Sequence, residues 1–498
     1  MSGCVDSISR PTQGPSVPQS TVRRTKIVAT LGPAWCHPER MVQLLDAGVN
    51  VVRVNASHGT PELRGKWIRD LQRVRKDRRS PVAILVDLHG PRIRVGQLSE
   101  PRELAQGQSV TFAPEASATG AEIPTTYAGL AGDMRAGSRI LLDDGLLSVE
   151  VTTVRGDRVD GIVRYGGLLR ANKGMNLPGV DVSAPAVTEK DKEEVAHAVE
   201  LGVDYIGVSF VRRAEELNQL RGLIPKRIQL VAKIEKDTAL LQLESILDAA
   251  DAVMVARGDL GVELPFEQVP LVQKRIIREA NLRGKPVITA TQMLESMVKA
   301  PRPTRAEASD VANAILDGTD AVMLSAETAV GDYALEAVQA MDRIAREVES
   351  HRKGRSAAFD LAVGRRSGGG SERFAARKAR TEDAIAVAVC AASELLATRV
   401  IACFTSSGFT ARTVASFRPS VPIVAVTPEP DTYRALALVW GVTPVLVDHV
   451  PDYDAMIPVA RAALLDQGLV NVGDRVVVTA GVPFDQPGTT NLLKIETV

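Results

Sequence analysis

Eight short apolar runs recur along the first two thirds of the 498-residue chain. Most are followed by a turn and an amphipathic stretch, such as residues 38–47 or 271–283, which is typical of a helix. The alternation predicts an α/β protein and favours a (β/α)8 TIM barrel, although a doubly wound open sheet would give the same pattern. The runs are residues 26–32, 49–57, 82–88, 205–211, 229–235, 252–259, 286–293 and 321–328.

The interval between the third and fourth runs is far longer than one crossover needs. It contains four segments typical of β-strands, separated by turn sequences such as Asp143-Asp144-Gly145. Thr188 and Asp191 then form a helix cap signal before the fourth run. We therefore expect a small β-barrel domain over residues 91–185, inserted in a barrel loop and acting as a lid. Its expected strands are residues 108–113, 139–142, 146–154 and 158–165.

The remaining boundaries follow from composition. Residues 1–22 are rich in Ser, Pro, Gln and Thr and predict a disordered tail rather than a signal peptide. The barrel is expected over 23–90 and 186–352, and a Gly-, Ser- and Arg-rich linker over 353–373. Residues 374–498 predict a C-terminal open-sheet α/β domain. Its expected elements are a helix at 382–397 and strands at 399–405, 423–427, 442–447 and 475–479.

Charge and cysteine content exclude several classes of protein. Lys plus Arg and Asp plus Glu both number 60, so no basic surplus indicates nucleic acid or an anionic membrane as a partner. No run of about 18 apolar residues predicts a membrane span. Cys4, Cys36, Cys390 and Cys403 form no C-x-x-C pair, which argues against zinc and fits the reducing cytoplasm.

Charged residues gather where the predicted strands end, and in a barrel these ends meet at one mouth. Glu235 and Asp259 could share a Mg²⁺ or Mn²⁺ ion, and Lys233 could neutralise an oxyanion. Arg53 and Arg94 carry the forked donors that grip phosphate or carboxylate. Taken singly, each residue could equally make a surface ion pair or a helix cap.

Six segments of the chain carry a specific similarity to a known family. They are residues 53–59, 87–94, 233–235, 253–265, 286–297 and 301–327. Together they resemble the pyruvate kinases. The similarity extends from about residue 24 to residue 498, includes the closing Pro-Gly-Thr-Thr-Asn of 487–491, and is most specific over 288–327. The resemblance implies transfer of the phosphoryl group of phosphoenolpyruvate to ADP, giving pyruvate and ATP in glycolysis, by a cytoplasmic, allosteric homotetramer.

The resemblance also implies roles for individual residues. Lys233 would stabilise charge on the transferring phosphoryl group and the enolate, and Arg53 would bind the phosphate. The backbone of Gly258 and Asp259, with Thr291, would hold the substrate carboxylate, and Thr291 would lie near the carbon that is protonated. Glu235 and Asp259 would hold the Mg²⁺ or Mn²⁺ ion. The residues implied on the nucleotide side are Asn55, His58, Arg94 and Lys173.

The third strand end departs from the family pattern. Many members need K⁺ and carry a segment like Asp-Thr-Lys-Gly-Pro-Glu-Ile-Arg-Thr, whereas residues 87–95 here read Asp-Leu-His-Gly-Pro-Arg-Ile-Arg-Val. The changes are Leu88, Arg92 and Val95. Arg92 places a fixed cation where those members have an acid, so we expect no K⁺ requirement, unless the changes are neutral. The remnant of the ion site would be Asn55, Ser57, Asp87 and Leu88.

Two further points remain open. A loop in the third domain carries hydroxyl groups suited to a phosphorylated allosteric effector, although an ordinary helix cap explains them as well. A metal-dependent, pyruvate-forming aldolase would also use Lys233, Glu235 and Asp259, but it would not explain Lys173 of the lid. A non-catalytic paralogue that binds metabolites is the other alternative. The effector loop candidates are Thr405, Ser406, Ser407, Gly408 and Thr410.

Overall fold

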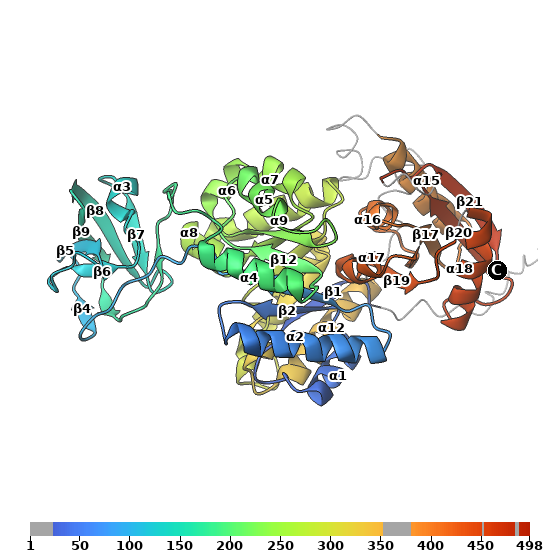
Figure 1. The fold of residues 1–498 in the computed structure, drawn as a ribbon, viewed down its shortest axis with the longest axis horizontal. Helices are drawn as coiled ribbons and strands as arrows, with labels where there is room; N and C mark the ends of the chain where they lie inside the picture. The colour runs from blue at the N-terminus through green and yellow to red at the C-terminus, as the bar shows by residue number, and fades with distance from the viewer. Residues whose placement is uncertain (1–22, 352–379, 451–452, 484–487) are drawn as a thin grey trace, which may run out of the picture.

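The computed structural model describes residues 23–351, 380–450, 453–483 and 488–498. The expected tail at 1–22 and the expected linker at 353–373 both lie outside these ranges. The chain forms three bodies in a row, with the barrel in the centre, the inserted domain on one side and the C-terminal domain on the other (Figure 1). Within the described part, no helix is long and apolar enough to cross a membrane.

The central body is a closed barrel of eight parallel strands, as the apolar runs predicted. Its strand order is β1-β16-β15-β14-β13-β12-β3-β2, and β1 closes the barrel by pairing with both β16 and β2. Each strand ends earlier than its apolar run, because the last polar residues of the run turn into the loops at the mouth. The strands are β1 Lys26–Thr30, β2 Val51–Asn55, β3 Ala83–Asp87, β12 Tyr205–Val208, β13 Gln229–Ile234, β14 Ala252–Ala256, β15 Val287–Ala290 and β16 Ala321–Leu324.

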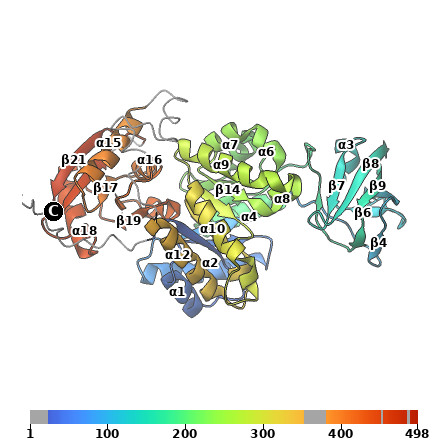
Figure 2. The ribbon, with the colours of Figure 1, turned by 180° about the vertical axis from the view of Figure 1, so that it is seen from behind.

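Helices surround the barrel, and the view from behind in Figure 2 shows α10 and α12 in front of it. The cap predicted at Thr188 is present, since its side chain and that of Asp191 form a capping box at the start of α4. Thr304 and Glu307 cap α10 in the same way. The helices are α1 Pro38–Asp46, α2 Pro61–Asp77, α4 Glu189–Glu200, α5 Ala214–Arg221, α6 Asp237–Leu241, α7 Leu243–Ala249, α8 Arg257–Glu263, α9 Val269–Leu282, α10 Arg305–Asp317, α11 Ala326–Ala329 and α12 Ala334–His351.

The inserted domain is a curled six-stranded sheet with its own core, which runs from Val95 to Val182. The sheet has the order β11-β7-β8-β9-β5-β6, and a separate pair joins β10 to β4. Arg94 bridges to Gly174, and Val95 bridges to Thr125, so one stretch of chain links the two edges of the sheet. The strands are β4 Arg102–Leu104, β5 Ser109–Pro114, β6 Ile123–Thr125, β7 Arg139–Leu142, β8 Leu147–Arg155, β9 Arg158–Tyr165, β10 Gly167–Leu169 and β11 Met175–Asn176.

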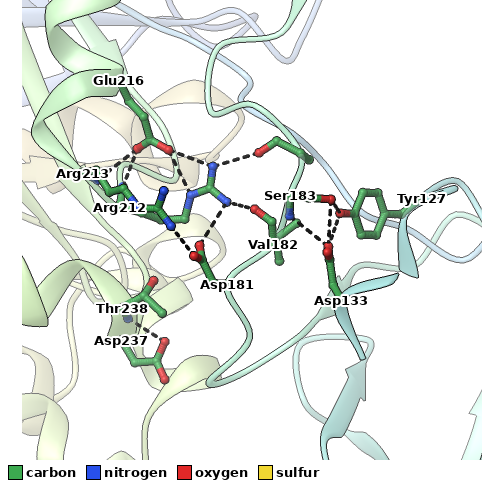
Figure 3. A network of polar contacts seen from close by, with 11 residues as sticks. Tyr127, Asp133, Asp181, Val182, Ser183, Arg212, Arg213, Glu216, Asp237 and Thr238 are labelled. Carbon is green, nitrogen blue, oxygen red and sulfur yellow. Dashed lines mark hydrogen bonds and ion pairs between the residues drawn. The ribbon is translucent and has the colours of Figure 1, made fainter. Parts of the chain in front are cut away.

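The segment that returns from the inserted domain to the barrel is held from both sides (Figure 3). Arg212 of the barrel donates to the carbonyls of Val182 and Ala184, the second at 2.8 Å. Between them, the amide of Ser183 donates to Asp133 of the inserted domain at 2.9 Å. The barrel and the inserted domain therefore hydrogen-bond to consecutive residues of one connecting segment. This segment, residues 182–184, is the joint between the two domains.

The C-terminal domain is the expected open sheet, with order β19-β18-β17-β20-β21. Only β21, Leu492–Thr497, runs antiparallel within this sheet, and the sequence pattern did not predict it. The domain contacts the barrel floor, where Tyr205 Oη donates to the carbonyl of Ala435 at 2.6 Å. Its other elements are α15 Thr381–Leu395, β17 Ile401–Phe404, α16 Phe409–Ala415, β18 Ile423–Thr427, α17 Pro430–Ala435, β19 Val442–Leu446, α18 Tyr453–Asp466 and β20 Arg475–Ala480.

Candidate active site

A cavity of about 420 Å³ lies where the mouth of the barrel faces the inserted domain. It brings together most of the residues expected at the strand ends, together with Lys173 of the inserted domain. Its lining does not include His58, Gly258 or Thr291. The sequence-predicted residues that line it are Arg53, Asn55, Ser57, Asp87, Leu88, Arg92, Arg94, Lys173, Lys233, Glu235 and Asp259.

Lys233 lies at the centre of the polar groups in this cavity. Its ammonium is 2.8 Å from Glu235 Oε1 and 3.1 Å from Asp87 Oδ1, and it donates to Ser209 Oγ at 2.6 Å. Burial alone would lower the pKa of Lys233, but the carboxylates of Asp87 and Glu235 outweigh it and raise the pKa to about 12. The side chain is therefore a permanent cation at neutral pH.

Glu235 and Asp259 have the chemistry of a site for a hard divalent cation. Burial raises the pKa of both carboxyl groups, that of Glu235 to about 7, although Lys233 opposes the effect. Within the described ranges, no three His, Cys, Asp or Glu side chains gather as a protein-only metal site would require. Two carboxylates nevertheless suit Mg²⁺, which keeps several waters and takes further oxygens from substrate phosphates.

Arg53 is fixed beside the same lysine. Its Nε donates to Asp87 Oδ2 at 2.8 Å, and its Nη1 donates to Thr30 Oγ1 at 3.0 Å. Burial would raise the pKa of Asp87, but the charges of Lys233 and Arg53 outweigh it, so the pKa is lowered. Asp87 is therefore an anion that holds two cations in place at the mouth.

Gly258 and Thr291 meet at the neighbouring strand ends. Gly258 and Asp259 lie in the first turn of a short helix, α8. The amide of Gly258 donates to Thr291 Oγ1 at 2.8 Å. A Cβ added to Gly258 would lie 3.1 Å from that oxygen, so a larger residue would disturb the contact. Thr291 has φ of 65°, a conformation that a β-branched residue rarely adopts.

The cations of the third strand end face the same cavity. Arg92 Nη2 donates to Ser57 Oγ, and Arg94 Nη1 donates to the carbonyl of Asn172 at 3.2 Å. His58 is largely exposed and lies outside the cavity lining. Its partial burial and the charges of Arg92, Arg53 and Arg94 lower its pKa. Val95, by contrast, is buried in the core of the inserted domain and does not line the cavity.

Several cavity residues were missed in the sequence. Asp143 and Asp144 read as turn residues, and their φ angles of 52° and 55° are those of a turn. Both line the cavity, and Asp143 pairs with Lys173 at 2.8 Å. Lys236 also lines it and pairs with the buried Glu263 at 2.5 Å. Ser209 is the first residue after β12 and Lys236 is the second after β13, and these positions at strand ends were the signal that could have identified them.

The expected effector loop lies between β17 and α16 of the C-terminal domain. The carbonyl of Ser406 accepts a hydrogen bond from Thr432 Oγ1 at 2.6 Å, and Thr410 Oγ1 lies 2.8 Å from Thr490 Oγ1. Gly408 has φ of 77° and precedes the first residue of α16. Part of the loop is thus engaged in contacts within its own domain.

Comparison with known proteins covers both large parts of the chain. The family model described as pyruvate kinase, barrel domain, matches residues 22–338, and the one described as pyruvate kinase, alpha/beta domain, matches residues 383–496. The chain belongs to the pyruvate kinase family. As a pyruvate kinase, it transfers the phosphoryl group of phosphoenolpyruvate to ADP, giving pyruvate and ATP.

Individual relatives agree with the family models. The chain is 45% identical over 484 residues to the pyruvate kinase of Geobacillus stearothermophilus, which covers 96% of this chain and 80% of that protein. It is 40% identical to the pyruvate kinase of Clostridium acetobutylicum, with 96% and 100% covered. A crystal structure of a pyruvate kinase from Cryptosporidium parvum matches with a TM-score of 0.88 at 33% identity, covering 95% and 96%. The aldolase and the non-catalytic paralogue are therefore not supported.

Proposed function

We propose that the barrel mouth performs the pyruvate kinase reaction with Lys233 as the main charge-stabilising group. The observation that carries this proposal is the buried ammonium held between Glu235 and Asp87. Phosphoryl transfer needs positioning and charge stabilisation rather than an activated nucleophile, because ADP supplies the attacking oxygen. Arg53 binds the phosphate of phosphoenolpyruvate, and Lys233 stabilises negative charge on the phosphoryl group and on the enolate oxygen.

The enolate then receives a proton at its methylene carbon. We assign the substrate carboxylate to the backbone of Gly258 and Asp259 in the first turn of α8, where the N–H groups have no partner within the helix. The Gly258 amide also donates to Thr291 Oγ1, so this turn holds the threonine beside the carboxylate. Thr291 binds the same carboxylate and lies beside the protonated carbon. A hydroxyl group can donate and accept at once, so Thr291 and water can pass a proton without a histidine.

Glu235 and Asp259 are the proposed ligands of Mg²⁺ or Mn²⁺. The bound ion would supply a fixed positive charge beside the phosphate and the enolate oxygen. The raised pKa of both carboxyl groups supports this assignment, because a cation would restore the charge that burial disfavours. Lys233 remains the protein's own cation at this place.

The inserted domain acts as a lid over the nucleotide. Asn55, His58, Arg94 and Lys173 are the proposed nucleotide-side residues, and Lys173 must reach the phosphates from the lid. We expect the lid to swing about its joint when Mg²⁺-ADP binds. Fluorescence transfer between a dye on the lid and a dye on the barrel should change on saturation. An unchanged distance would mean that the inserted domain does not move relative to the barrel when the nucleotide binds.

We also propose that Arg92 replaces K⁺. Burial and the charge of Arg94 lower the pKa of Arg92, whereas the nearby carboxylates of Asp259, Asp87 and Glu235 oppose this effect and favour the cation. The rate in tetramethylammonium buffer should therefore match the rate in K⁺ buffer. Arg92→Glu combined with Leu88→Thr should make the enzyme respond to K⁺. Stimulation of the wild type by about a hundredfold, or about 2.7 kcal/mol in transition-state stabilisation, would contradict the proposal.

The proposal also covers the cellular location, the oligomeric state and the binding of an effector. Within the described part of the chain, Cys36 and Cys403 carry free thiols, which supports a reducing cytoplasmic location. The homotetramer rests on the resemblance to the family, and light scattering tests it. The loop of Thr405, Ser406, Ser407, Gly408 and Thr410 is the proposed place for a phosphorylated effector, and titration with sugar phosphates would test it by a change in cooperativity.

One steady-state assay tests the proposed chemistry as a whole. Phosphoenolpyruvate and ADP are supplied with and without Mg²⁺, and ATP and pyruvate are both measured. We expect equal amounts of the two products, and no turnover once Mg²⁺ is chelated. Turnover that persists without a divalent cation would remove Glu235 and Asp259 from the metal role.

A further inference from the structure

Two consecutive residues after β15 adopt a left-handed backbone conformation that glycine favours. Thr291 has φ of 65° and Gln292 has φ of 53°. Such a conformation costs free energy in a non-glycine residue, and most of all in a β-branched one, so it persists only where the surroundings impose it. A neighbouring group must therefore impose this conformation on Thr291 and Gln292.

Arg257, the first residue of α8, binds this turn directly. Its Nη2 donates to the carbonyl of Thr291 at 2.7 Å and to that of Gln292 at 3.2 Å. Its Nη1 donates to Asp310 on α10 at 2.7 Å and reaches Gln273 on α9 at 3.4 Å. One planar guanidinium therefore fixes both carbonyls of the strained turn and is itself anchored by two helices.

The same turn determines where the hydroxyl of Thr291 lies. Thr291 Oγ1 accepts the hydrogen bond of the Gly258 amide, which leaves the hydroxyl proton for another acceptor. No side chain or carbonyl in the described part of the chain accepts it. Arg257 and Gly258 are adjacent in sequence, so one end of β14 holds both the backbone and the side chain of Thr291.

We propose that Arg257 is a positioning residue that holds Thr291 in the conformation needed to protonate the enolate. The inference rests on the proposed role of Thr291. Arg257 itself touches no substrate and forms no bond in the reaction. A merely structural role, in which Arg257 only ties α8 to α10 through Asp310, would give a different result in the experiment below.

The experiment measures proton transfer apart from phosphoryl transfer. Exchange of the methyl hydrogens of pyruvate with solvent deuterium, in the presence of Mg²⁺ and ATP, reports formation and protonation of the enolate. Arg257→Met should lower this exchange on the order of a hundredfold, as misplacement by about 1 Å does. Arg257→Lys should give an intermediate loss, because an ammonium keeps the charge but lacks the fork.

Arg75→Met is the matched control. Arg75 also pairs with a carboxylate, Asp204 at 2.7 Å, and donates to a carbonyl, that of Val82 at 3.1 Å, but it lies at the opposite end of the barrel strands. The Arg75→Met variant should have a lower melting temperature than the wild type and an unchanged exchange rate. Equal exchange in Arg257→Met and Arg75→Met would overturn the proposal. If Arg257→Met does not fold, the same comparison is made with Arg257→Lys.

A double variant separates this proposal from the one on which it rests. Thr291→Ala alone should lower the exchange, and adding Arg257→Met should lower it no further, because both act through one hydroxyl. If the double variant instead lost the product of the two single losses in exchange rate, Arg257 would act independently of Thr291, and the proposal would be wrong. If Thr291→Ala leaves the exchange unchanged, the proposed role of Thr291 fails. A crystal structure of Arg257→Met would then decide whether Arg257 holds the turn, since release of Thr291 from positive φ is expected.

Discussion

Lys233→Met should abolish most of the phosphoryl transfer while leaving binding of phosphoenolpyruvate largely intact. Loss of one charge-stabilising group in a buried site costs on the order of 10²–10³ in rate, or about 2.7–4 kcal/mol, and Lys233 is the cation at the centre of this cavity. Ground-state binding is retained because Arg53 still grips the phosphate. The measurement is kcat at saturating Mg²⁺ and both substrates, with substrate binding followed separately by calorimetry.

Lys26→Met is the control for this variant. Lys26 is also a buried lysine of the barrel, but it lies at the start of β1, where it donates to the carbonyl of Val442 at 2.7 Å. Its loss should affect stability and leave kcat unchanged. A Lys233→Met enzyme within about tenfold of the wild type, a difference of only about 1.4 kcal/mol, would remove Lys233 from its assigned role.

Glu235→Gln and Asp259→Asn should each raise the Mg²⁺ concentration needed for half activity. Loss of a partner in the outer shell of a metal site already costs roughly 10–100-fold in affinity, and loss of a direct ligand should cost at least as much. Both variants should fold, because burial disfavours the charge of these carboxylates and an amide lacks that charge. Titration with Mn²⁺ measures the affinity directly.

Asp320→Asn provides the comparison for the carboxylate variants. Asp320 is about as buried as Glu235 but lies at the other end of the barrel, where it pairs with Arg418 at 3.0 Å. Its loss should leave Mn²⁺ affinity unchanged. Wild-type affinity in both Glu235→Gln and Asp259→Asn would mean that the metal binds elsewhere.

Much of the fold could be read from the sequence, because eight apolar runs with helices between them have few ways to bury their strands. The errors lie where tertiary contacts override the local pattern. β11 has two residues, and it is held by β7 rather than by any local preference. β21 lies at the edge of its sheet and has no fully buried residue, so it lacks a clear apolar face.

Part of the active site could also be predicted from the sequence, because the barrel topology determines which strand ends meet. Lys233, Glu235 and Asp259 follow apolar runs, and barrel topology brings such positions together. Asp143 and Asp144 were read as turn formers, because the turn they form is local while the cavity they line is not. The bond from Arg257 to Thr291 joins residues on different strand ends, and no sequence spacing indicates it.

One metal ion, held by Glu235 and Asp259, is proposed to share the barrel mouth with Lys233. Anomalous diffraction from crystals soaked with Mn²⁺ and phosphoenolpyruvate locates this ion. We expect one strong peak within about 2.1 Å of an oxygen of each carboxylate, with the substrate phosphate next to it. A peak bound by neither Glu235 nor Asp259 in a crystal that also holds the substrate would contradict it.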